Sequence, residues 1–225
     1  MSRSLVLPRR RFLTSAALLP AAAWTVPGAW AEMLEATARQ TEGPFYPDSL
    51  PLDTDNDLLK LNDASSPADG EIAHFSGRVL SLAGLPMRGC TVEIWQADAR
   101  GVYIHSGSGN ASNRDANFQG YGRSLTGKDG RFYFRTIKPV KYTGRPPHIH
   151  VIVSRGDRKL LTTQCYIKGE PSNDRDRLFL QAPADQRDTL LADFRPDPRQ
   201  VAGVTVPQWE AEWDIVIGLT PNERG

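Results

Sequence analysis

The sequence has few cysteines, which limits the chemistry that sulfur can supply. Cys90 and Cys165 are the only two in 225 residues. Both lie in apolar, strand-like runs, where a free cysteine packs as a small hydrophobic side chain. We therefore expect two free thiols, with one disulfide as the alternative in an exported protein. A thiolate metal site is not expected, because neither cysteine lies near the histidine pair described below.

The sequence also lacks a long uninterrupted hydrophobic run. The apolar stretch at residues 16–26 is short for a membrane span and contains a proline. It follows a twin arginine, Arg9-Arg10, and Ala29-Trp30-Ala31 forms a small-x-small cleavage site after it. These features predict a twin-arginine export signal over residues 1–31 rather than a membrane anchor, and therefore a periplasmic or secreted protein.

An excess of charge of one sign is missing as well. Residues 1–31 contain four arginines and no acidic residue, so their removal leaves 23 Lys and Arg against 26 Asp and Glu, a net charge of −3. A domain with this balance is not expected to bind nucleic acids or membrane surfaces. The sequence leaves the oligomeric state open, a homo-oligomer included.

Long helical patterns are scarce, because 17 prolines and 19 glycines separate short apolar segments. This punctuation predicts an all-β fold, an antiparallel β-sandwich with long loops and one or two short helices. We assign residues 32–70 to an extended N-terminal arm that docks on the domain, and residues 71–225 to one β-sandwich domain. Strands are predicted at residues 73–80, 90–97, 131–136, 148–153, 160–167 and 207–219, a helix at 183–194, a hairpin-type turn at 128–130 and a second turn at 155–157.

The most informative stretch is His148-Ile149-His150, which precedes the β-branched run Val151-Ile152-Val153. That run favours a buried strand. Side chains i and i+2 of a strand point to the same face, so the two imidazoles project side by side and can chelate one metal ion. Two hydrogen-bonded structural histidines are the alternative. A catalytic zinc site would use a third histidine or a carboxylate, and only His74 and His105 remain as histidines.

Six stretches along the chain form a set that is much more specific than a His-x-His pair alone. The stretches are Thr41-Glu-Gly-Pro-Phe-Tyr46, Val92-Glu-Ile-Trp-Gln-Ala-Asp-Ala-Arg-Gly-Val-Tyr103, Asn117-Phe-Gln-Gly-Tyr-Gly-Arg-Ser-Leu-Thr-Gly-Lys-Asp-Gly130, Phe134-Arg-Thr-Ile-Lys-Pro139, Arg145-Pro-Pro-His-Ile-His150 and Thr163-Gln164. In their number and order they resemble the intradiol ring-cleavage dioxygenases, especially the protocatechuate 3,4-dioxygenase branch. The similarity covers roughly residues 70–170, with one further motif in the arm.

The resemblance implies a mononuclear iron site, with one Fe(III) per chain. The matching ligands are Tyr103, Tyr142, His148 and His150. Anionic phenolate oxygens suit this hard cation, and coordination to a highly charged ion can remove the phenol proton. The resemblance implies that Tyr142 leaves the metal and accepts a proton when substrate binds. It also implies that Arg145 stabilises charge developing on the substrate and that Gln164 supports the site from the neighbouring strand.

The resemblance further implies a reaction in the catabolism of aromatic compounds. Both atoms of O2 would enter a catechol-type substrate, and the ring would open between the two hydroxyl-bearing carbons to a muconate-type diacid. The segment between Tyr142 and His148 is shorter than in protocatechuate enzymes, so the particular catechol stays open. Two other functions are the alternatives: a transthyretin-like binding sandwich, and a zinc hydrolase that uses the His-x-His pair.

Overall fold

The computed structural model describes residues 33–60, 66–142, 144–197, 199–201 and 204–218, all within one compact unit that spans Glu32–Gly225. The predicted export signal, residues 1–31, lies outside the described residues. None of the helices in the described part of the chain has the length and apolar character needed to cross a membrane.

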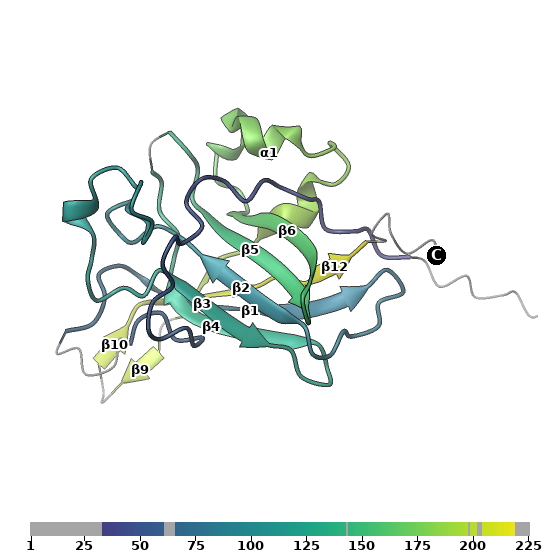
Figure 1. The fold of residues 1–225 in the computed structure, drawn as a ribbon, viewed down its shortest axis with the longest axis horizontal. Coiled ribbons are helices and arrows are strands. Elements are labelled where there is room, and N and C mark those ends of the chain that lie inside the picture. The colour runs from purple at the N-terminus through teal and green to yellow at the C-terminus, as the bar shows by residue number, and fades with distance from the viewer. Residues whose placement is uncertain (1–32, 61–65, 143, 198, 202–203, 219–225) are drawn as a thin grey trace, which may run out of the picture. The chain divides into compact units, whose positions relative to one another are not determined.

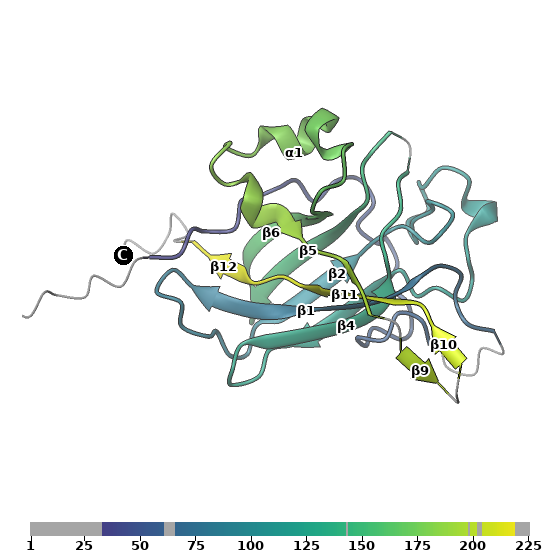
Figure 2. The same ribbon diagram turned by 180° about the vertical axis from the view of Figure 1, so that it is seen from behind.

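Two five-stranded sheets make up the fold (Figures 1 and 2). In the first sheet, one edge of β1 pairs with β4, and its other edge pairs with β11 and β12 in succession. The members of this sheet are β1 (Ile72–Ser81), β4 (Arg131–Ile137), β8 (Arg195–Pro196), β11 (Gln208–Glu212) and β12 (Ile215–Ile217). The second sheet has the order β3 (Tyr121–Leu125), β2 (Thr91–Trp95), β5 (His148–Arg155), β6 (Arg158–Ile167) and β7 (Leu191–Ala192). A separate ribbon pairs β9 (Arg199–Val201) with β10 (Val204–Val206).

The main hydrophobic core draws on both sheets, which confirms the predicted all-β sandwich. Ile149, Val151 and Val153 of β5 belong to the same buried cluster as Phe75 of β1 and Phe134 of β4. Because side chains alternate along a strand, His148 and His150 project from the opposite, outer face of their sheet. Parallel pairing occurs beside the antiparallel ladders, at β1–β11, β1–β12 and β6–β7.

The N-terminal arm crosses the outer face of the second sheet, as Figure 1 shows, and its docking agrees with the prediction. The Gln40 amide donates to the Thr162 carbonyl at 3.0 Å, and the Thr163 hydroxyl donates to the Ala38 carbonyl at 2.7 Å. All six residues of β5 from His148 to Val153 are buried. The strand is therefore covered on both faces, by the sandwich core on one side and by the arm and loops on the other.

The helix predicted over residues 183–194 is wrong. That segment forms the 3-10 turn η3 (Arg187–Leu190) and then β7, which pairs in parallel with the end of β6. Leu190 is fully buried in a cluster with Tyr166, so tertiary packing outweighs the local helical pattern. The structure instead contains α1 (Arg177–Gln181), together with the 3-10 turns η1 (Ala111–Asn113) and η2 (Asn173–Arg175).

The hairpin predicted at residues 128–130 is also wrong in its connection. A tight turn is present, with Gly130 at φ 73°, but β3 and β4 on either side of it belong to different sheets. The turn at residues 155–157 does close a hairpin, because β5 and β6 pair up to Arg155 and Arg158. Strand β3 was not predicted at all.

The strand predicted over residues 207–219 is divided into β11 and β12 by Trp213 and Asp214. Trp213 donates its amide to the Ser76 carbonyl at 2.8 Å. This contact brings the chain so close to β1 that a Cβ at Gly77 would lie 1.8 Å from the Trp213 carbonyl oxygen. Only glycine fits at this position without a backbone shift.

Gly77→Ala is expected to lower the free energy of unfolding by about 3 kcal/mol, because either β1 or the β11–β12 connection must move. Urea denaturation measures the change. Gly109→Ala is the matched control, since a Cβ there meets no atom within 4 Å, and its expected effect is below about 0.5 kcal/mol. Equal unfolding midpoints for the two variants would contradict the close approach.

Candidate functional site

The four predicted ligand side chains converge on one point. His148 and His150 come from β5, Tyr103 from the loop after β2, and Tyr142 from the loop that enters β5. The Nε2 atom of His150 lies 3.2 Å from Nε2 of His148 and 3.1 Å from the Tyr103 hydroxyl oxygen. The Tyr142 ring meets Tyr103 edge to face, with centroids 5.0 Å apart, and lies 5.5 Å from the His148 ring. Their ligation of a metal stays a prediction.

The two histidines are buried and neutral. His148 Nδ1 lies 2.7 Å from the Pro146 carbonyl oxygen, which can only accept, so Nδ1 carries the hydrogen and Nε2 presents a lone pair. Burial, and after it the charge of Arg145, lowers the pKa of His148 to about 3. Burial, and after it His148, lowers the pKa of His150 well below its usual value. Neither imidazole is protonated at neutral pH, as metal binding requires.

The two tyrosines have different surroundings. Tyr103 is 1% exposed, and its burial, followed by the neighbouring Tyr142 phenol, raises its pKa well above the usual value. Tyr142 is only half-buried and borders two hollows of about 300 and 400 Å³. Its carbonyl accepts the Arg145 amide at 2.7 Å, across a turn in which Gly144 has φ 78°. Tyr103 is thus held by packing, whereas Tyr142 has space to move.

Arg145 and Gln164, the other predicted site residues, are hydrogen-bonded to each other. Arg145 Nη2 donates to Gln164 Oε1 at 2.8 Å. Gln164 pairs with His150 across β5 and β6, and its Nε2 donates to the Thr41 carbonyl of the arm at 2.9 Å. Both ends of the glutamine amide are therefore in use, and its oxygen faces the arginine.

Aromatic residues that were not predicted as site residues form the walls of the site. Trp95 pairs with His150 in the β2–β5 ladder and stacks on its ring at 4.7 Å and 12°. Phe45 of the arm stacks on Tyr103 at 5.1 Å, and Tyr46 meets Trp95 edge to face at 5.1 Å. Only two features of the sequence pointed to these contacts: the motif in the arm, and the alternation of side chains in β2.

Two more residues were missed, Asp176 and Tyr166. Both contact Arg145: Asp176 accepts from its Nε at 2.8 Å and from its Nη2 at 3.1 Å, and the Tyr166 hydroxyl lies 3.2 Å from Nη2. Tyr166 stands two residues after Gln164 on β6 and so shares its face. An aspartate before a short apolar run is a helix N-cap signal, which does not indicate an arginine partner.

The remaining histidines and the cysteines are not among the converging side chains, although the His105 ring meets Phe45 edge to face at 6.0 Å. His74 bonds the Tyr133 hydroxyl through Nδ1 and Gln208 Oε1 through Nε2, each at 2.6 Å. His105 Nδ1 accepts the Gly107 amide at 2.8 Å. In the described ranges, no three His, Cys, Asp or Glu residues lie close enough together to hold a metal ion. Cys90 and Cys165 are free and buried, as expected.

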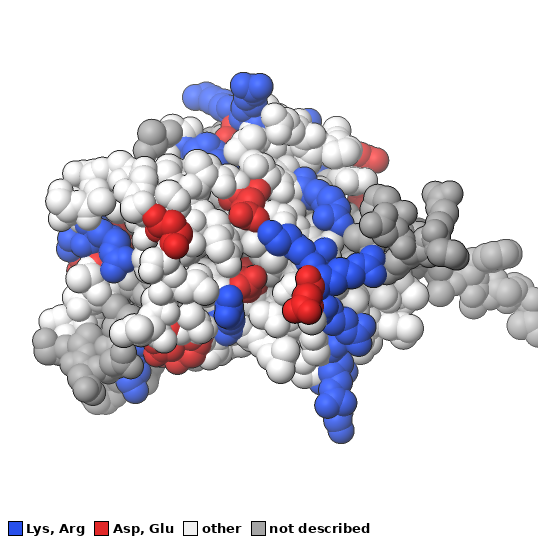
Figure 3. All heavy atoms as spheres, in the orientation of Figure 1, with Lys and Arg blue, Asp and Glu red and all other residues white. Residues whose placement is uncertain are grey.

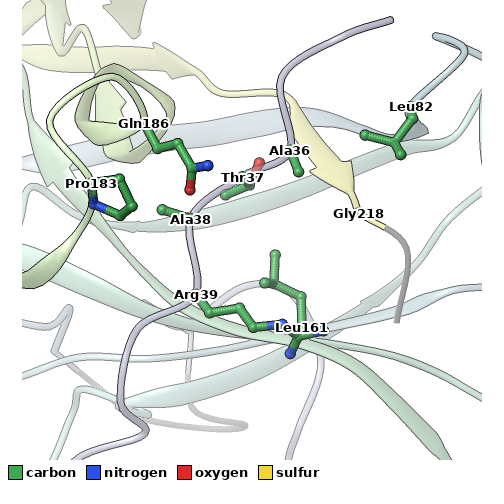
Figure 4. A pocket seen from close by; sticks show the side chains of 9 residues that line it. All are labelled: Ala36, Thr37, Ala38, Arg39, Leu82, Leu161, Pro183, Gln186 and Gly218. Atoms are coloured by element: carbon green, nitrogen blue, oxygen red, sulfur yellow. The ribbon is translucent and has the colours of Figure 1, made fainter. Parts of the chain in front are cut away.

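The surface has two further features, its charge pattern and a cavity. Charges of both signs are interspersed on the face drawn in Figure 3, and much of that surface carries neither. A cavity of about 430 Å³ opens where the arm passes β6, bordered by Thr37, Arg39, Leu161 and Gln186 (Figure 4). None of the predicted site residues lines it.

The β-sandwich and the Tyr–His cluster are features of one class of enzyme. Comparison of the sequence with known protein families identifies that class. Residues 41–218 match the model of the Dioxygenase family, Dioxygenase_C. The chain belongs to the intradiol ring-cleavage dioxygenases and is therefore an oxidoreductase.

Two relatives and one solved structure show how similar this chain is to individual members of the family. The protocatechuate 3,4-dioxygenase beta chain of Burkholderia cepacia is 36% identical over 208 residues, covering 85% of this chain and 84% of that protein. Catechol 1,2-dioxygenase 1 of Acinetobacter lwoffii is 32% identical over 60% of this chain, which spans only 47% of that relative. The dioxygenase domain of a carbohydrate-binding fusion protein from Streptomyces sp. SirexAA-E superposes with a TM-score of 0.62, at 33% identity, over 83% of this chain and 100% of that one.

The buried histidines predict how the stability of the metal-free protein depends on pH. The pKa of His148 is about 3 in the folded state against 6.5 in the unfolded chain, so the unfolded state takes up a proton first as the pH falls. The stability contribution is therefore present above pH 6.5 and is lost progressively toward pH 3. Urea unfolding between about pH 7 and pH 4 measures the decline. His148→Gln should make it shallower and the control His105→Gln should not; identical slopes in both would contradict the assignment.

Proposed function

We propose that this protein is a non-haem Fe(III) intradiol dioxygenase that inserts both atoms of O2 into a catechol-type substrate. The ring is cleaved between the two hydroxyl-bearing carbons, and the product is a muconate-type diacid. The observation that carries the proposal is the convergence of Tyr103, Tyr142, His148 and His150, of which only Tyr142 is partly exposed. Relatives named as protocatechuate, catechol and hydroxyquinol dioxygenases favour a catechol-type substrate and O2 as the partners.

The donor set fits one Fe(III) ion per chain, with those four side chains as ligands. His148 and His150 direct Nε2 atoms toward each other, and the Tyr103 hydroxyl completes a group of contacts of 3.2 Å or less away from water. A cation shared by these atoms satisfies the lone pairs, and phenolate oxygens offset its charge. When bound, the ion would act as a Lewis acid that makes the ring of a catechol-type substrate reactive toward O2.

The difference between the tyrosines supports separate roles. Tyr103 is packed beneath Phe45 and cannot move without disturbing the arm, so it anchors the site. Tyr142 borders open hollows on a short turn, so its side chain can leave the cluster. Its phenolate oxygen then accepts a proton from a substrate hydroxyl. The site thereby contains its own base.

Arg145 supplies positive charge close to the two histidines, where negative charge develops on the substrate oxygens. Its Nε and Nη2 atoms are occupied by Asp176, Gln164 and Tyr166. In the described part of the chain its Nη1 has no partner, so this nitrogen can donate to a substrate oxygen. Gln164 also holds the guanidinium, by accepting from Nη2.

Family membership favours this function over the two alternatives, a transthyretin-like binding sandwich and a zinc hydrolase. A tyrosinate bound to Fe(III) absorbs visible light, whereas a zinc site and a metal-free protein are colourless. The colour of the protein therefore separates the three functions before any substrate is known.

The purified protein is expected to be red-brown and to contain about one iron per chain, since tyrosinate ligands stabilise Fe(III). Tyr103→Phe and Tyr142→Phe should each shift the absorption band. A panel of catechols, followed by O2 uptake and product absorbance, identifies the substrate, and removal of the iron should abolish turnover. A colourless protein with stoichiometric zinc would contradict the proposal.

We also propose export by the twin-arginine route, to the periplasm or beyond the cell. The Arg9-Arg10 pair and the cleavage site Ala29-Trp30-Ala31 support this. The double change Arg9→Lys and Arg10→Lys keeps the charge and is expected to leave full-length precursor in the cytoplasm, as measured by cell fractionation. Arg3→Lys is the matched control. Export of the double variant at the parent level would exclude this route.

A further inference from the structure

Asp176 is a buried carboxylate on which two separate structures depend. Its side chain is 4% exposed, and both of its oxygens accept from Arg145, Oδ1 from Nε at 2.8 Å and Oδ2 from Nη2 at 3.1 Å. Oδ2 also accepts the Phe179 amide at 3.0 Å and so caps the N-terminus of α1. The same carboxylate therefore joins the arginine beside the histidine cluster to the helix that follows β6.

The paired geometry determines which edge of the guanidinium stays available. A planar guanidinium that donates from Nε and Nη2 to one carboxylate has no freedom to rotate about its own axis. In this orientation Nη2 also reaches Gln164 Oε1 at 2.8 Å, and Nη1 is left without a partner among the described residues. If Asp176 were absent, the remaining partners Gln164 and the Tyr166 hydroxyl would contact only Nη2. Neither contact prevents rotation of the guanidinium.

Helix capping does not require this arrangement. An N-cap needs only one acceptor oxygen and no charge, so serine or asparagine serves as well as aspartate. Pairing with Arg145 needs two oxygens and a negative charge. Asp176 therefore carries a negative charge and a second oxygen that capping of α1, a helix of five residues, does not require.

We propose that Asp176 is a positioning residue for the ring-cleavage reaction, holding the Arg145 guanidinium so that Nη1 faces the substrate. It acts through Arg145 and does not itself touch the reacting atoms. This inference rests on the proposed function, because the charge that Arg145 stabilises arises only during catechol cleavage.

Asp176→Ser separates capping from positioning. Serine keeps a capping oxygen but is too short to pair with Arg145, so the Phe179 amide should stay protected from hydrogen exchange. In the iron-loaded enzyme kcat/KM is expected to fall about 10- to 100-fold, mainly through kcat, because the lost interaction strengthens in the transition state. Asp174→Asn, an exposed aspartate two residues away, is the matched control and should retain parent activity. Asp176→Asn, which keeps the size of the side chain, is the second variant if the serine protein folds poorly.

A double-mutant cycle tests whether Asp176 acts through the arginine. In an Arg145→Met background, Asp176→Ser should cause little further loss of kcat/KM, because the group that it positions is gone. A purely structural role would reduce activity by the same factor in both backgrounds. Equal factors, or full activity of Asp176→Ser alone, would overturn the proposal.

A crystal structure of Asp176→Ser gives a readout that does not depend on activity. A rotation of the Arg145 guanidinium that redirects Nη1 supports the positioning role, whether or not Nη2 keeps its contact with Gln164 Oε1, and an unchanged guanidinium orientation overturns it. If the parent protein cleaves no catechol, the proposed function fails, while the crystal structure still decides whether Asp176 orients Arg145.

Discussion

Burial of β5 on both faces is the constraint on which the rest of the structure depends. One face contributes Ile149, Val151 and Val153 to the sandwich core, and the other carries His148 and His150. A polar side chain buried without partners is costly, so the outer face must provide matching groups as well as exclude water. It does so with Tyr103, the Pro146 carbonyl and the stacked ring of Trp95. Nδ1 of His150 is the exception, since it has no partner among the described residues.

The arm is the element that closes this face. Its backbone is hydrogen-bonded to β12 at Thr37 and to β6 at Gln40, and its Thr41 carbonyl and Phe45 ring reach Gln164 and Tyr103. The wall of the site is thus formed by a segment about 100 residues away in sequence from the histidines that it covers. Such an arrangement keeps the cluster dry, which strengthens every electrostatic interaction within it. It also means that loosening the arm would expose the site without altering any of the four central side chains.

Charge around the cluster is arranged in layers. The neutral histidines and the two tyrosines lie innermost, Arg145 lies next to them, and Asp176 lies behind Arg145. Burial, then the arginine, lowers the pKa of His148, while the aspartate acts in the opposite direction. Asp176 thus moderates the charge of Arg145 at the histidines as well as orienting it, and it ties both functions to the short helix α1.

The sequence by itself determined the shared face of His148 and His150, because a strand has a period of two residues and the β-branched run marks the strand. It also predicted the sandwich class and the docked arm from punctuation and apolar residues. Tyr103 and Tyr142 were found only through the family resemblance, since separation along the chain does not define distance in space. The tertiary structure alone decided that Asp176 meets Arg145, that residues 183–194 form a turn and a strand, and that β3 and β4 lie in different sheets. In each case the free energy of packing between distant segments outweighs local propensity, and local patterns carry no information about it.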